Sequence, residues 1–214
     1  DAMGRVLGEV SGAWDASGLA GTVDANGRFT VARTAGSQAG LITFKAGEMK
    51  ASARVRVFAR FPWEEAFSAV EIGKAPAGWI GASNRYTVQE KDGNRVLAKP
   101  FLDQGIERSN LYFGLATMQG YTIQADVMGS VKGRKRPDLG LINGAYILDL
   151  MGAHQRLQIR DWEEPRFRQT VEFAWEPDTW YSMKMTVEVV GDRAIVSGKV
   201  WKAGTEEPEA WTIT

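Results

Sequence analysis

The chain has 214 residues and a formal net charge of zero, because 26 lysines and arginines balance 26 aspartates and glutamates. This balance creates no global field that would attract nucleic acid or an anionic membrane, so we expect neither as a partner. The absence of cysteine excludes disulfides and thiol catalysis, and the one histidine, His154, excludes a metal site built from several histidines. No apolar run is long enough to span a bilayer and no signal peptide is recognisable at Asp1. We therefore expect either that a signal has been removed or that the sequence belongs to a longer chain.

The first 60 residues contain several short stretches with the period of two that is typical of strands. In the last of them, Ala51, Ala53, Val55 and Val57 alternate with polar residues, which predicts a strand with one apolar face. The segment Asp24–Gly27 is a predicted turn, because Asn-Gly suits positive φ angles. The predicted strands are Val6–Trp14, Leu19–Val23, Phe29–Arg33, Leu41–Ala46 and Met49–Phe58.

The stretch Thr22–Ala32, with its D-x-x-G-x-F-T pattern, and the later run Ala51–Val57 resemble the bacterial immunoglobulin-like domains. In that family a hairpin of this kind precedes a final strand of the A-x-V-x-V type. The resemblance implies a partial immunoglobulin-like domain over residues 1–60, of which the later strands are recognisable. We expect the sequence to begin inside this domain. Its open edge would then be completed by the rest of the chain, by a second copy or by a different subunit.

Pro62 interrupts the strand pattern and predicts a boundary between residues 60 and 61. The segment Trp63–Phe67 resembles the opening strand of secreted jelly-roll sandwiches. Further on, Lys91–Asn94 is a strong turn signal between two predicted strands, Tyr86–Glu90 and Arg95–Lys99.

From Tyr121 onward the alternation of apolar and polar residues becomes long and regular. Antiparallel strands at this spacing cannot bury their apolar faces alone, so the sequence predicts two packed sheets and an all-β fold. Trp175, Trp180 and Trp201 fall at positions that we expect to be buried in the core. The predicted strands are Tyr121–Met128, Ala145–Met151, Leu157–Trp162, Val171–Trp175, Trp180–Val190, Ala194–Trp201 and Ala210–Ile213.

The sequence Trp175–Lys184, followed by a Gly191-Asp192 turn and a return strand, is similar to the concanavalin A-like lectin and glucanase sandwiches, which include laminin G-type modules and 3-keto-disaccharide hydrolase-like domains. More closely, the chain resembles the C-terminal region of bacterial exported proteins that carry a PQQ-type β-propeller upstream. The resemblance implies a concanavalin A-like jelly-roll β-sandwich over residues 61–214 and a periplasmic or cell-surface location. It is carried by Pro137–Asn143, Gln155–Trp162, Trp175–Lys184 and Gly198–Trp211.

Catalysis is not predicted by any arrangement of acidic residues in the chain. Glycoside hydrolysis needs two carboxylates across a cleft, and the E-x-D-x-x-E pattern of glucanases with this fold is absent. Asp126, Asp149 and Asp161 lie on or beside predicted strands, but their spacing does not require any two of them to meet. His154 falls in a predicted turn, where a lone histidine is more often a surface residue than a catalytic base. We therefore assign no catalytic residue.

Trp162, between Asp161 and Glu163, is the candidate ligand-binding group for a glycan. An exposed ring stacks on the CH groups of a pyranose, and neighbouring carboxylates accept hydrogen bonds from its hydroxyls. The alternative interpretation is a half-buried tryptophan at the end of a strand.

Two further groups of residues have a functional and a structural interpretation. Asp138, Asn143 and Asp149 could supply oxygen ligands for Ca²⁺, which the fold class makes plausible although no calcium-loop consensus is present. Lys132, Arg134, Lys135 and Arg136 form a basic loop that either binds phosphate or an acidic polysaccharide, or is simply solvated. The zero net charge and the absence of a second basic run favour the solvated loop.

The leading functional hypothesis is a non-catalytic binding or scaffolding module of the bacterial cell envelope, with other protein subunits as partners. The alternatives are a carbohydrate-active enzyme and a carbohydrate-binding module. An enzyme requires carboxylates gathered in a cleft, a sugar binder requires an exposed tryptophan, and a scaffold requires a strand edge or an apolar surface open to a neighbour. Fold class alone does not distinguish these possibilities.

Overall fold

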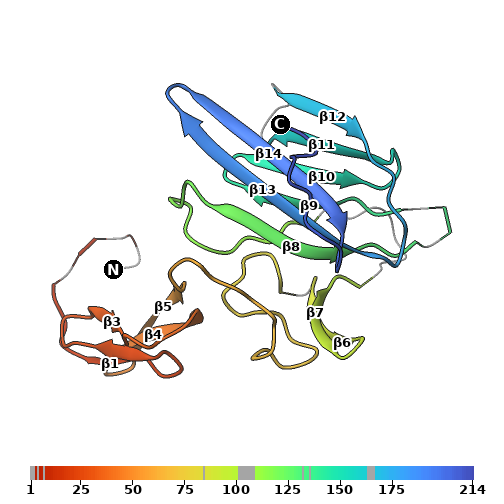
Figure 1. Ribbon diagram of the computed structural model, residues 1–214. Helices are drawn as coiled ribbons and strands as arrows, with labels where there is room; N and C mark the ends of the chain where they lie inside the picture. Colours follow the sequence, from red (N-terminus) through yellow and green to blue (C-terminus); the bar gives the residue numbers. More distant parts are fainter. Residues whose placement is uncertain are drawn as a thin grey trace. The chain divides into compact units, whose positions relative to one another are not determined.

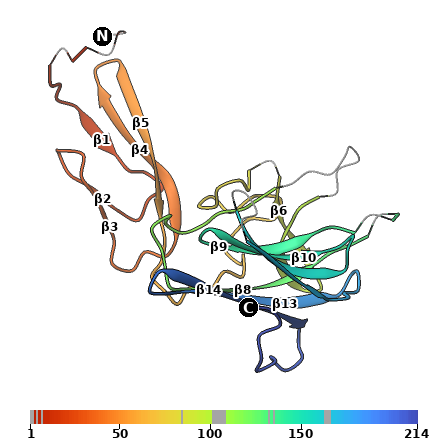
Figure 2. The ribbon, with the colours of Figure 1, turned by 90° about the horizontal axis from the view of Figure 1, so that it is seen from above.

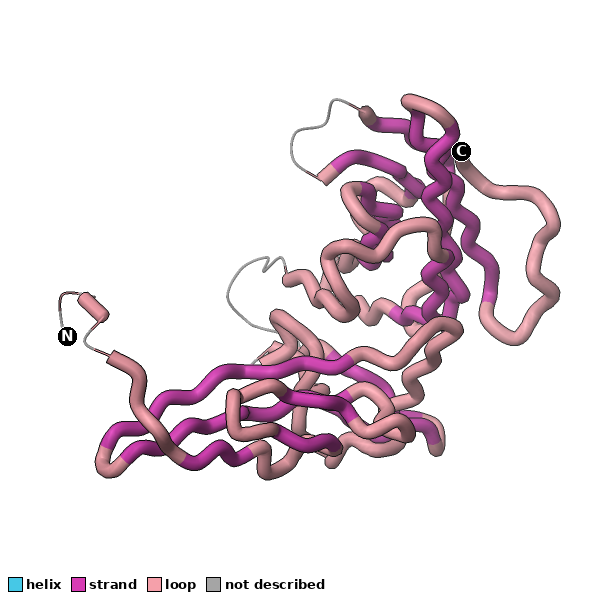
Figure 3. The backbone as a smooth tube through the Cα atoms, turned by 90° about the vertical axis from the view of Figure 1, so that its left-hand side faces the viewer, coloured by secondary structure: helices cyan, strands magenta, loops and turns pink. Residues whose placement is uncertain are grey.

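A computed structural model describes residues 3, 5–6, 8–83, 85–100, 109–131, 133–134, 136–162 and 167–214. These residues form strands and turns and no helix, so the predicted all-β class is confirmed (Figure 3). None of them belongs to a helix long and apolar enough to cross a membrane. The chain divides into two compact units, Asp1–Leu115 and Ala116–Thr214. This division, between residues 115 and 116, differs from the domain boundary expected between residues 60 and 61. The boundary at 60/61 stays a prediction.

The first part of the chain forms a three-stranded antiparallel sheet and a separate hairpin (Figure 2). The sheet has the order β1-β4-β5, with β1 at Ala13–Asp15, β4 at Gln38–Ala46 and β5 at Met49–Val57. The hairpin consists of β2 (Gly21–Val23) and β3 (Phe29–Val31). The strand expected over Val6–Trp14 is shorter than predicted, because β1 pairs with β4 only at three residues.

The turn between β2 and β3 forms as predicted. The Oδ1 atom of Asp24 accepts hydrogen bonds from the backbone N–H groups of Asn26 and Arg28, each at 2.9 Å. Gly27 has a φ of 79°, and a Cβ atom at this position would lie 2.5 Å from the ring of Trp14. Trp14 in turn packs on Phe44, with ring centroids 4.7 Å apart. The glycine therefore serves both the turn and the packing of the hairpin on the sheet.

Residues 61–115 contain an aromatic cluster and a second hairpin. The segment Trp63–Phe67, expected to open a sandwich, is not a strand. Trp63 instead packs on Phe113 at 5.0 Å between ring centroids, and Phe113 stacks on Trp79 at 4.5 Å. Phe67, whose φ is 56°, meets Trp79 edge to face. The hairpin is formed by β6 (Thr87–Lys91) and β7 (Asn94–Ala98), joined by the predicted two-residue turn.

The second unit is built from two antiparallel sheets that share one core (Figure 1). The four-stranded sheet has the order β12-β11-β10-β9 and the three-stranded sheet has the order β14-β13-β8. The first consists of β9 (Leu139–Asn143), β10 (Tyr146–Met151), β11 (Arg156–Asp161) and β12 (Arg168–Glu172). The second consists of β8 (Thr122–Met128), β13 (Trp180–Val190) and β14 (Arg193–Lys202).

The core lies between these sheets and follows the predicted alternation. Tyr181, Met183 and Met185 are buried on one face of β13, and they meet a layer of leucine and isoleucine from the other sheet. A Cβ atom on Gly198 would lie 2.6 Å from Leu148, so the sheets approach closely at a point where β14 has no side chain. The buried residues of the four-stranded sheet are Leu141, Leu148, Leu150, Leu157 and Ile159.

The three tryptophans expected in the core differ in burial. Trp175 is 2% exposed, as predicted, and its indole N–H donates to the carbonyl oxygen of Met151 at 3.4 Å. Trp180 and Trp201 are only half-buried. Trp180 is the first residue of β13, and Trp201 pairs with Ser182 on the face that points away from the core.

Replacing Trp175 by alanine should lower the free energy of unfolding by about 3–5 kcal/mol, because the substitution leaves a cavity in the core. Urea denaturation followed by circular dichroism measures the change. Val189→Ala, at a position that is 71% exposed, is the control and should change stability by about 0.5 kcal/mol or less. Equal effects of the two substitutions would contradict this placement of the core.

Candidate functional site

The residues predicted to bind a glycan lie at one end of the four-stranded sheet. Asp161 is the last residue of β11 and pairs with Tyr146 of β10. Trp162 follows, donating its backbone N–H to the carbonyl oxygen of Ala145 at 2.8 Å, and it is 39% exposed. Glu163 lies outside the described residues. Trp162 is thus partly exposed, while Asp161 is half-buried.

The three candidate calcium ligands are engaged in different places. Oδ1 of Asp138 accepts the N–H of Gly152 at 2.7 Å, and the carboxylate of Asp149 forms a 2.7 Å ion pair with Arg160. The buried amide of Asn143 donates to the carbonyl oxygen of Tyr121 at 3.0 Å. Because Asp149 pairs with Gly140, it faces the side of the sheet opposite to Asn143. No three His, Cys, Asp or Glu side chains gather in a metal-binding group in the part of the chain that the structure describes.

The basic loop is only partly described. Arg134 is exposed, while Lys132 and Lys135 lie outside the described residues. Arg136 donates from Nη1 to the carbonyl oxygen of Trp175 at 3.2 Å, and its guanidinium carbon lies 5.9 Å from the centroid of the Trp175 ring. Arg136 therefore has a structural role beside the core.

A charged cluster that sequence reasoning missed lies on the outer face of the three-stranded sheet. Lys199 of β14 is 6% exposed, and its Nζ atom lies 2.6 Å from Oε1 of Glu207 and 2.7 Å from the carbonyl oxygen of Pro208. Lys184 of β13 donates to both carboxylate oxygens of Glu207, at 2.7 and 2.8 Å. The ammonium group of Lys199 also forms a cation–π contact with Trp211, with Nζ 4.9 Å from the ring centroid. These contacts fasten the C-terminal segment, residues 203–214, to the sheet.

The two lysines set the ionisation of the carboxylate between them. Hydrogen bonds from Lys184 first, and from Lys199 second, hold the pKa of Glu207 below its usual value, against the smaller opposing effect of burial. Since both ammonium groups are paired with this carboxylate, the cluster is suited to holding the segment in place. No local sequence pattern predicts this cluster, because Lys184 and Glu207 are brought together only by the folding of the segment over the sheet.

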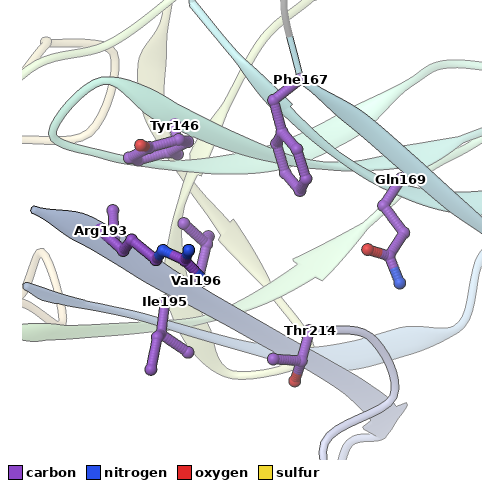
Figure 4. A pocket seen from close by; sticks show the side chains of 8 residues that line it. Tyr146, Phe167, Gln169, Arg193, Ile195, Val196 and Thr214 are labelled. Atoms are coloured by element: carbon purple, nitrogen blue, oxygen red, sulfur yellow. The ribbon is translucent and has the colours of Figure 1, made fainter. Parts of the chain in front are cut away.

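An open groove of about 450 Å³ lies at the edge of the sandwich (Figure 4). Tyr146 and Gln169 contribute to it from the four-stranded sheet, Phe167 from the position just before β12, and the start of β14 from the other sheet. Among the described residues, its lining contains two aromatic rings and one guanidinium group. The remaining lining residues are Arg193, Ala194, Ile195, Val196 and Thr214.

A strand edge is open in the first unit. β5 is the last strand of the β1-β4-β5 sheet, and among the described residues of its unit it pairs with β4 alone. Its nine residues are exposed from Met49 to Arg54 and half-buried from Val55 to Val57. Lys50, Ser52, Arg54 and Arg56 lie on one face, and Ala51, Ala53, Val55 and Val57 lie on the other.

The structure defines an all-β protein whose second unit is a two-sheet sandwich. Comparison of the chain with protein families, with curated proteins and with solved structures finds no match.

Replacing Glu207 by glutamine should destabilise the protein at neutral pH, and the loss should shrink in acid. Because the pKa of Glu207 is lower in the folded than in the unfolded state, its charge stabilises the fold above about pH 4.3, the usual pKa of a glutamate. This contribution is lost as the pH falls through the folded-state value. Urea midpoints of the wild-type protein and of Glu207→Gln, measured between pH 7 and pH 3, test it.

Glu209→Gln, at an exposed position in the same segment, is the matched control. A difference between wild-type protein and Glu207→Gln that stays constant across the pH range would contradict a role for the carboxylate charge.

Proposed function

We propose that this protein is a non-catalytic binding module that joins another protein by accepting a strand at the open edge of β5. The observation that supports the proposal is that a nine-residue edge strand is paired on one side only and exposed over most of its length. Unpaired backbone groups on such an edge form a template for another strand, and the added ladder supplies affinity.

The register of β5 identifies the groups that would receive the partner. The turn of two residues, Gly47 and Glu48, is closed by the pair of Ala46 and Met49. In a hairpin of this kind the closing residues exchange both backbone hydrogen bonds, and bonded and non-bonded pairs then alternate. Every second residue of β5, counted from Met49, therefore forms its backbone hydrogen bonds with β4. Lys50, Ser52, Arg54 and Arg56 direct their backbone N–H and C=O groups to the open edge.

The side chains of β5 favour an acidic partner over a second copy of this chain. Three of the four polar positions on β5 are lysine or arginine. Antiparallel pairing of two copies would place these cations opposite one another, which is unfavourable, whereas a strand with glutamate or aspartate at the facing positions is attracted. On the opposite face, small or branched apolar side chains of the partner would cover Ala51 and Ala53.

We further propose the finer architecture and setting implied by the resemblances in the sequence. These are a partial immunoglobulin-like domain over residues 1–60, a concanavalin A-like jelly roll over residues 61–214, and a place in a larger envelope assembly of an exported bacterial protein. The antiparallel sheets, the formed turn at Asp24–Gly27 and the two-sheet sandwich are consistent with this proposal.

The test uses a nine-residue peptide that alternates valine with glutamate and carries a proline at each end to prevent its own aggregation. It should bind the full chain measurably in isothermal calorimetry, and less tightly as salt increases. The same peptide with lysine in place of each glutamate should not bind. Arg54→Pro should abolish binding because it removes an edge N–H without removing a bond to β4, a position at which a strand tolerates proline.

Arg54→Ala controls for the loss of charge in this experiment and should weaken binding without abolishing it. Melting curves of both variants show whether the sheet is intact. If Arg54→Pro binds the glutamate peptide as tightly as Arg54→Ala does, the strand-addition proposal is wrong.

A second candidate function is carbohydrate binding, which the exposure of Trp162 beside Asp161 favours. In this function the indole face stacks on a pyranose ring and the neighbouring carboxylate accepts hydrogen bonds from hydroxyls.

If Trp162 binds sugar, the full chain should give hits on a glycan array that Trp162→Ala abolishes and Trp211→Ala, at another exposed tryptophan, retains. An array without hits for the wild-type protein would exclude this second function.

A further inference from the structure

The β1-β4-β5 sheet has one apolar face and one face on which positive charge gathers. The apolar face is packed, because Trp14 lies against Phe44 and a Cβ atom on Gly40 would meet the side chain of Leu19. Residues that pair across neighbouring strands share a face, so the register of the three strands defines the other one. We call it the basic face, and its charged residues are Asp15, Lys45, Lys50, Arg54 and Arg56.

The charge of the basic face is not neutralised within the described part of the chain. Its lysines and Arg54 are exposed and Arg56 is half-buried, and none of these four cations forms an ion pair or a side-chain hydrogen bond with another described residue. The one acid, Asp15, accepts hydrogen bonds from the backbone N–H and the hydroxyl of Ser17, at 3.2 and 2.5 Å. The face therefore keeps an excess of positive charge.

Two of these cations are held directly opposite each other. Lys45 of β4 and Lys50 of β5 are paired at the position next to the turn. The residues that close the turn, Ala46 and Met49, exchange backbone hydrogen bonds, so the lysines form a non-bonded pair, in which side chains approach most closely. Like charges at such a position destabilise a sheet. An anionic group that contacts both ammonium groups removes this repulsion, so the pair favours an anion site at this end of the face.

The two arginines continue the positive charge along β5. Arg54 and Arg56 are two residues apart on the same face, a separation of about 6.8 Å, and Arg54 lies about 14 Å along the strand from Lys50. On β4 the only cation is Lys45, and β1 has none. The charges thus follow one strand instead of spreading over the sheet. A row of this kind fits an extended anionic chain better than the plane of a membrane surface.

The side chains between the cations indicate what kind of anionic chain fits. The hydroxyl groups of Thr43 and Ser52 lie 3.0 Å apart in the middle of the face, and the exposed Ser52 can also bond to a sugar hydroxyl. The aromatic residues of the three strands, Trp14 and Phe44, lie on the apolar face, so neither nucleobases nor neutral sugars find a ring to stack on. Charge must then supply the affinity, and the planar fork of arginine matches a carboxylate.

We propose that the basic face binds an acidic polysaccharide, which lies along β5 with anionic groups at the Lys45–Lys50 pair and at the two arginines. This inference goes beyond strand addition at the edge of β5, because it uses side chains of a sheet face, among them one from β4, and no backbone group. It is also independent of Trp162, because every residue of the site belongs to the first unit.

The test uses a chain of eight α-linked galacturonic acid units and its fully methyl-esterified form, which has the same sugars without their charge. The acidic octamer should bind the full protein chain saturably in isothermal calorimetry, and more weakly as salt increases. The esterified octamer should not bind. Equal binding of the two octamers, or binding of neither, overturns the proposal.

Variants of the lysine pair test the same contacts from the side of the protein. Lys45→Gln combined with Lys50→Gln should weaken binding of the acidic octamer about tenfold. The same double variant should raise the midpoint of urea denaturation, because it removes the repulsion between the two lysines. Arg28→Gln combined with Arg33→Gln is the control, since it removes as much charge at exposed positions outside the sheet and should leave binding nearly unchanged. Unchanged affinity of the lysine variant, or a fall in its urea midpoint, overturns the proposal.

Two further comparisons separate the basic face from the edge of β5 and from other anionic polymers. Arg54→Pro, which should abolish pairing of the glutamate peptide, should bind the acidic octamer as well as Arg54→Ala does, because the sugar uses no backbone group. Weaker binding by Arg54→Pro than by Arg54→Ala would place the octamer at the edge and overturn the proposal. A single-stranded oligonucleotide or an oligoglutamate of equal charge that binds as tightly as the octamer would also overturn it, since the face would then not select a polysaccharide.

Discussion

The burial of one apolar layer between two sheets is the constraint on which the second unit depends. Leu148 and Leu150 from β10 and Met183 and Met185 from β13 are all fully buried in it. Because alternate residues of a strand face opposite sides, a slip of one residue in either strand would move its whole set of core side chains into solvent. Gly198 adds a second condition, since any side chain there would collide with Leu148 and separate the sheets.

The same alternation decides what lies on the outer face of the three-stranded sheet. Gly198 and Val200 face the core, so Lys199 between them points away from it. The C-terminal segment nevertheless covers Lys199, which is almost inaccessible to solvent. A buried ammonium group is costly unless it is paired, and Glu207 together with the carbonyl oxygen of Pro208 supplies that pairing. The charge cluster and the bridge of Ile213 to β14 are thus two attachments of one segment.

The sequence predicted the long strands well because their signal is local. β13 has the predicted bounds, and β8 differs by one residue, since a period of two over many residues leaves little choice. The strand predicted at Trp63–Phe67 does not form. Aromatic residues without strict alternation are equally suited to an aromatic cluster whose members are joined by turns. The candidate sites were harder to predict. Tyr146, Phe167, Arg193 and Thr214 lie far apart in the chain, and only the stacking of unequal sheets brings them to one groove.

The open edge of β5 illustrates how the side chains of an edge strand limit which strands can pair with it. An exposed edge invites pairing with any other edge, including that of an identical molecule. On β5 the outward-directed residues are mostly cations, so identical edges repel, while an acidic strand gains the charge attraction in addition to the backbone ladder.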